Sequence, residues 1–113
     1  MSQQCTWIGR LVDDVNFNFG TEGNPWCWFK LAVPRAYRPK EGKKVKVDWL
    51  EFKAFGNVAE DLGDGEKGQL LEIHGHVENY SREKKDGGGK EYGLQIVADF
   101  GINHSKKPDE TAE

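Results

Sequence analysis

Residues 47–55 alternate two kinds of side chain with a period of two, which is the period of a β-strand. One set is uniformly apolar: Leu50, Phe52 and Ala54. The other set holds two large rings with two charged residues between them: Trp49, Glu51, Lys53 and Phe55. A solvated strand face does not need two large rings, so this face is predicted to bind a ligand. Trp49 and Phe55 are six residues apart, which is roughly 20 Å in a strand and suits several nucleotides rather than one pocketed base.

An aromatic platform of this kind fits single-stranded nucleic acid, because every base has a π-face and a stack is worth about 1–3 kcal/mol. Basic residues are concentrated nearby, although the net charge of the chain is −3. Residues 30–53 contain eight Lys or Arg against three Asp or Glu, and residues 82–90 contain four against two. A local positive field attracts phosphates, although lysine-rich loops are also often only solvated. The phosphate-binding candidates are Lys30, Arg35, Arg38, Lys43, Lys44, Lys46, Lys53, Arg82, Lys84, Lys85 and Lys90.

Other patterns that could carry chemistry are incomplete. His74 and His76 share a strand face but have no evident third metal ligand. The run from Gly87 to Lys90 lacks the leading glycine and the following Ser or Thr of a phosphate loop. No Ser/His/Asp or Cys/His arrangement and no paired carboxylates are evident. We therefore expect a binding protein that is not an enzyme and has no cofactor or metal.

The composition indicates one small domain in a reducing compartment. The chain has 113 residues, 14 of them glycine, and 12% are aromatic. Its two cysteines, Cys5 and Cys27, lie in apolar runs and are predicted to be reduced thiols. The first residues lack the charged start and apolar stretch of a signal peptide, and no apolar run is long enough to span a membrane. We expect a cytoplasmic protein.

The remaining pattern predicts an all-β fold. Strands are expected at 5–12, 26–34, 47–55, 69–80 and 92–100, with polar loops at 35–46 and 81–91. A short helix is expected after Gly56, capped by Asn57 with Glu60 as its partner. Trp7, Phe29 and Phe52, with Trp26 or Trp28, are assigned to the core or to an interface. Five strands with one short helix between strands 3 and 4 predict an OB-fold barrel over residues 1–104, followed by a short polar tail, 105–113, that we expect to be disordered.

These residues resemble the bacterial, phage and plasmid single-stranded DNA-binding protein family. The block from Trp49 to Glu60, WLEFKAFGNVAE, is similar to the W-x5-FG-x-[LV]-AE pattern of that family. The first strand resembles its GRL followed by Asp, and residues 29–33 resemble its second strand. Residues 73–77 resemble its fourth strand, with His74 in place of the usual Glu. The resemblance extends over residues 5–103, nearly the whole chain.

The resemblance implies stacking residues at five positions: Trp49, Phe55, Tyr37, Phe19 and Tyr80. Tyr80 lies two residues before the family position, which Arg82 occupies. Asn18 stands where Arg is common, which removes one phosphate contact. The acidic tip with a terminal aromatic residue, through which the family recruits partners, is absent, so recruitment in that way is doubtful or the chain is a divergent phage or plasmid member.

The expected function is sequence-tolerant binding and protection of single-stranded DNA in replication, recombination, repair or plasmid and phage DNA metabolism. The resemblance also implies a homo-oligomer, a dimer or a tetramer, and exposed Trp7, Trp26, Trp28 and Tyr92 would suit its interface. Two alternatives stay open. One is an OB-fold adaptor that binds a replication or conjugation protein, and the other is an RNA-binding chaperone.

Overall fold

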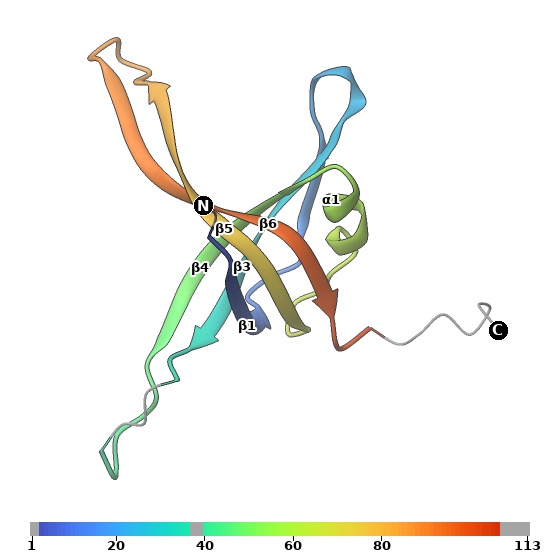
Figure 1. The fold of residues 1–113 in the computed structure, drawn as a ribbon, viewed down its shortest axis with the longest axis vertical. Coiled ribbons are helices and arrows are strands. Elements are labelled where there is room, and N and C mark those ends of the chain that lie inside the picture. The colour runs from blue at the N-terminus through green and yellow to red at the C-terminus, as the bar shows by residue number, and fades with distance from the viewer. Residues whose placement is uncertain (1–2, 37–39, 107–113) are drawn as a thin grey trace, which may run out of the picture.

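The computed structural model describes residues 3–36 and 40–106, and their strands form one sheet that closes into a barrel (Figure 1). In chain order the elements are β1 (Cys5–Leu11), β2 (Asn16–Phe19), the 3-10 helix η1 (Thr21–Gly23), β3 (Pro25–Pro34), β4 (Val47–Phe55), α1 (Asn57–Leu62), β5 (Leu70–Glu83) and β6 (Lys90–Asn103). The predicted five-stranded barrel with one short helix is confirmed. The short β2 and η1 are additional elements between the first two expected strands.

The barrel closes because β1 changes partner along its length. The strand order is β1-β5-β6-β4-β3-β2, and a further pairing joins the end of β1 to β3. The two strands approach closely at Gly9, since a Cβ there would lie 2.5 Å from the carbonyl oxygen of Ala32. Only a residue without a side chain lets β1 come this near to β3.

Alternate residues of β3 and β4 fill the barrel. Phe29 and Phe52 are fully buried and stack, with ring centroids 5.4 Å apart. Trp7 packs edge-on against Phe52 at 5.3 Å. The buried Ala59 and Leu62 of α1 complete the core at one end of the barrel. Phe29 and Phe52 are therefore confirmed as core residues, and the half-buried Trp7 packs against them.

The start of α1 differs from the prediction. Gly56, not Asn57, precedes the helix, and no side chain caps it. The backbone N–H of Glu60 donates to the carbonyl oxygen of Gly56 at 3.1 Å. Gly56 has a φ of 63°, a left-handed conformation that glycine adopts without strain. The capping box from Asn57 was wrong because the sharp turn out of β4 places the glycine at the capping position.

The β5–β6 hairpin projects from the barrel as a long arm, drawn in orange in Figure 1. Its ladder continues to the pair Glu83↔Lys90, so the loop is shorter than the predicted 81–91.

Within the described residues no helix is long and apolar enough to cross a membrane. Cys5 and Cys27 are both free thiols, and burial raises the pKa of Cys27 to about 11. Most of the predicted tail, 107–113, lies outside the described residues.

Candidate nucleic-acid interface

The outer face of β3 and β4 carries the predicted platform. Trp49 and Phe55 are 67% and 51% exposed, while Phe52 and Ala54 of the same strand are fully buried. The two-residue alternation therefore separates an exposed aromatic face from the core, as the sequence indicated. Whether these two rings contact a nucleic acid stays a prediction.

Two further rings lie on this face, where the sequence assigned a core or interface role. The antiparallel register pairs Trp26 with Phe55 and Trp28 with Lys53. Directly paired residues point to the same side of a sheet, so both indoles share the outer face. Their neighbours Cys27 and Phe29 are the buried residues of β3. The signal was present in the sequence, because Lys30 has the same period as both tryptophans and a lysine marks the solvent side.

A chain of polar contacts joins this face to the β5–β6 arm. The Lys53 ammonium donates to Oε1 of Gln95 at 3.3 Å, and Nε2 of Gln95 donates to Glu78 at 2.6 Å. Tyr80 follows Glu78 with a period of two, so it lies on the same side of the arm. Its ring covers Gly93, its partner across the ladder, where a Cβ would lie 2.6 Å from the ring. The structure thus brings Tyr80 onto the face that carries Lys53.

Arg82 lies beside Tyr80, with its guanidinium carbon 5.6 Å from the centre of the ring. Its Nε donates to Glu91 at 2.8 Å. This hydrogen bond is the main reason that the pKa of the Glu91 carboxyl lies below its usual value. Arg82 is therefore on the platform side but is already paired with a carboxylate.

Arg35 is also paired, on the other side of the sheet. It donates two hydrogen bonds to Asp48, from Nη2 at 3.0 Å and from Nε at 3.1 Å. The hydrogen bond from Arg35 lowers the pKa of Asp48. Asp48 and Trp49 are adjacent in the strand, so their side chains point to opposite faces of the sheet. The structure does not bring Arg35 together with Trp49.

The predicted lysines differ from these arginines. Among the described residues they take part in no ion pair. Lys30 of β3 is exposed, and so are the lysines in or next to the two loops: Lys43, Lys44, Lys46, Lys84, Lys85 and Lys90. Tyr37 and Arg38 lie outside the described residues.

Phe19 is 69% exposed and packs edge-on against Phe17 at 5.2 Å. Its register partner is Pro25, so it lies on the opposite side of the β2–β3 pair from Trp26.

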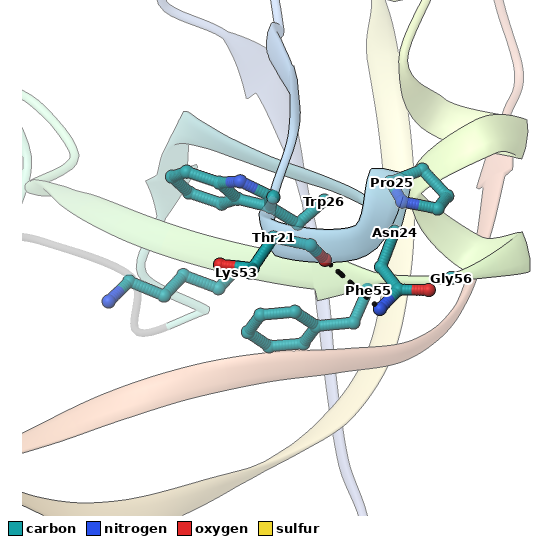
Figure 2. A pocket seen from close by; sticks show the side chains of 8 residues that line it. Thr21, Asn24, Pro25, Trp26, Lys53, Phe55 and Gly56 are labelled. Atoms are coloured by element: carbon teal, nitrogen blue, oxygen red, sulfur yellow. Dashed lines mark hydrogen bonds between the residues drawn. The ribbon is translucent and has the colours of Figure 1, made fainter.

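An open pocket of about 680 Å³ lies beside Phe55, at the end of β4 (Figure 2). Trp26 and Phe55 provide its aromatic walls, and Lys53 lies at one side. The turn that carries η1 closes it with Gly20, Thr21, Asn24 and Pro25, and Gly56 completes the lining. The sequence did not predict this pocket, because its walls come from three separate elements.

Histidines and carboxylates form a second polar cluster, on the outer side of β5 and β6. His76 contacts Asp99 at 2.8 Å and Glu78 at 3.0 Å, and these hydrogen bonds, that of Asp99 foremost, raise its pKa. His74 and His104 both contact Glu72, whose pKa is lowered chiefly by His74. No group of His, Cys, Asp and Glu in residues 3–36 and 40–106 has an arrangement that could hold a metal ion.

Comparisons with known proteins agree with this architecture. The model of the single-strand binding protein family matches residues 2–104. The chain is 29% identical over 113 residues to single-stranded DNA-binding protein 1 of Streptococcus pyogenes, covering 99% of this chain and 85% of that protein. It is 37% identical over 95 residues to the single-stranded DNA-binding protein of Clostridium tetani, covering 81% of this chain and 63% of that protein.

Solved structures show the same fold. A deletion mutant of the single-stranded DNA binding protein from Thermus aquaticus aligns with a TM-score of 0.75 at 27% identity, and the alignment covers 88% of this chain and 49% of that one. A Plasmodium falciparum SSB in complex with ssDNA aligns with a TM-score of 0.70 at 18% identity, covering 90% and 92%, and shows the fold alone. Because the family model spans nearly the whole chain, this protein belongs to the single-strand binding protein family, whose members bind DNA and are not enzymes.

Proposed function

We propose that this chain binds single-stranded DNA with little sequence preference and protects it in the cytoplasm during replication, recombination, repair or plasmid and phage DNA metabolism. The observation that carries the proposal is the outer face of β3 and β4. There Trp49 and Phe55 are exposed on a strand whose other side includes the fully buried Phe52 and Ala54. The family of the chain and the names of its relatives supply the ligand class.

The face combines the two interactions that a single strand requires. Exposed rings stack on bases without reading their edges, and lysines neutralise the phosphates between them. Lys30 and Lys53 lie on the platform, and the other lysines lie in the loops that border it, 40–46 and 84–90. Tyr80 extends the aromatic track onto the arm. We expect Trp49, Phe55 and Tyr80 to stack, and the lysines to set the salt dependence.

The test is binding of fluorescein-labelled oligo-dT, followed by anisotropy so that loss of a tryptophan does not change the signal. Trp49→Ala removes one stack of about 1–3 kcal/mol and is expected to weaken binding about tenfold. Tyr92→Ala is the control, because Tyr92 is 73% exposed but alternates with Gly93, away from Tyr80. Wild-type affinity in Trp49→Ala would refute the platform. Competition with oligo-U separates a DNA-binding protein from an RNA-binding one.

We also propose that the chain assembles with copies of itself. Three exposed apolar side chains lie on the outer side of β1 and β6: Ile8, Phe100 and Ile102, at 49%, 55% and 38% exposure. Exposed apolar patches of this kind mark interfaces. Light scattering gives the mass directly. A monomer at the concentrations used for binding would contradict the proposal.

A further inference from the structure

The pocket beside Phe55 has two aromatic walls that do not touch each other. Trp26 and Phe55 are direct partners across the β3–β4 ladder, where paired rings commonly stack. Neither ring takes part in a ring–ring contact among the described residues. Figure 2 shows the indole and the phenyl ring apart from each other, with the η1 turn beside them. The two rings therefore border a space instead of filling it.

The lining also leaves hydrogen-bonding atoms unused. Nδ2 of Asn24 donates to the carbonyl oxygen of Thr21 at 3.4 Å, which turns the amide across the floor of the turn (Figure 2). Its Oδ1 accepts no hydrogen bond from any residue that the structure describes, and Nε1 of Trp26 donates none to any of them. An acceptor and a donor thus stand at the edge of a space that is bounded by rings.

The pocket between Trp26 and Phe55 suits a flat ligand with polar edges. A nucleobase needs apolar surface against its faces and hydrogen-bond partners at its rim, and the pocket supplies both. The ammonium of Lys53 lies at the side that continues into the platform, where the phosphate of the same nucleotide would pass. The volume of about 680 Å³ lies within the range of small-ligand pockets.

We propose that one base of the bound strand leaves the stacked track and enters this pocket between Trp26 and Phe55, with its edge toward Asn24 and Thr21. The assignment rests on the proposed function and adds one defined nucleotide site to a track that otherwise ignores sequence. Trp26 becomes a DNA-binding residue. Base identity matters at that one position, because Asn24 and the indole N–H meet the edge of the base.

The test uses the shortest oligo-dT that binds the wild-type protein with full affinity, so that the strand cannot slide. A single abasic nucleotide is placed at each position in turn, and anisotropy gives the affinity of each oligonucleotide. One internal position is expected to show the largest loss, at least about fivefold, because a removed stack is worth about 1 kcal/mol or more. In Trp26→Ala the intact oligo-dT binds at least about fivefold more weakly, and the abasic nucleotide at that position costs nothing more.

A second variant fills the pocket without removing a wall. A Cβ at Gly20 would lie 3.5 Å from Cδ1 of Trp26, an ordinary contact, and the φ of Gly20 is −84°, which any residue adopts. Gly20→Val is therefore expected to fold and to exclude the base, with the same loss as Trp26→Ala. Thermal melting checks that both variants are folded.

The outcomes separate the two proposals. If wild-type protein binds oligo-dT and Trp49→Ala weakens binding, while Trp26→Ala and Gly20→Val bind as wild type, the pocket assignment is overturned and the function stands. An equal abasic penalty in wild type and Trp26→Ala at every position also overturns it. If wild-type protein does not bind oligo-dT, both proposals fall.

Discussion

Arg82 allows a test of whether DNA phosphates pass along the β5–β6 arm, because in the free protein its guanidinium is paired with the Glu91 carboxylate. Its Nε donates to Glu91 at 2.8 Å, and its guanidinium lies over the ring of Tyr80. Glu91→Gln removes the charge that competes with a phosphate and leaves the ring that positions the guanidinium. The variant is expected to bind single-stranded DNA more tightly at low salt.

The size of the effect follows from counterion release. Each phosphate neutralised on a single strand contributes about −0.7 to the slope of log affinity against log salt concentration. In Glu91→Gln the Arg82 guanidinium is free to contact one more phosphate. The slope of log affinity against log salt concentration should therefore be steeper by about 0.7. Between about 50 mM and 200 mM salt this difference amounts to an extra loss of about 2.6-fold. Anisotropy titrations of labelled oligo-dT at several salt concentrations measure it.

Asp48→Asn is the matched control. It changes the net charge by the same amount and breaks the same kind of exposed pair, with Arg35, but on the side of the sheet away from Trp49. Its slope is expected to stay at the wild-type value. Equal steepening in both variants would show that overall charge and not the position of Arg82 sets the binding. An unchanged slope in Glu91→Gln would remove Arg82 from the interface.

Two further predictions concern stability. Gly75→Ala places a Cβ 2.0 Å from the carbonyl oxygen of Val97, so we expect a loss of about 1–3 kcal/mol in denaturant unfolding, whereas Gly20→Ala meets no such contact and should lose little. The pKa of His76 is raised by its hydrogen bond to Asp99, so protonated His76 stabilises the fold; this contribution is complete below the unfolded value of about 6.5 and disappears as the pH rises through the raised pKa. Thermal melts from pH 5 to 9 should show a small fall in Tm over that range in wild type, and a smaller fall in Asp99→Asn. A parallel pH profile in the two proteins would contradict the role of this pair.

Much of the platform could be predicted because strand alternation is a local property. Leu50, Phe52 and Ala54 had to face one way and Trp49 and Phe55 the other, whatever the strands beside them. The same alternation was available for β3, but Trp26 or Trp28 was assigned to the core or to an interface, and the register places both on the outer face. The residue type alone does not tell whether a tryptophan in a strand lies in the core or on the surface. Lys30, on the same side of β3, was the better indicator of the exposed face.

Other features depended on contacts between distant segments. Gly56 and not Asn57 starts α1, because the turn out of β4 needs a φ of 63°. Arg35 and Arg82 looked alike as free cations in basic loops, but the fold gives each a carboxylate at hydrogen-bonding distance. No spacing within either loop reveals those pairs, because they form across strand ladders.

The sequence by itself determined the class of fold and one aromatic, basic strand face, since both follow from period-two patterns and glycine-marked turns within single segments. Only the tertiary structure decided which strands lie beside that face, and that their side chains leave a pocket beside Phe55. The pairing of Trp26 with Phe55 and the η1 turn above them make a pocket from residues 20 to 56. Its walls are set by register and barrel closure, which depend on the packing of the whole core and not on any one segment.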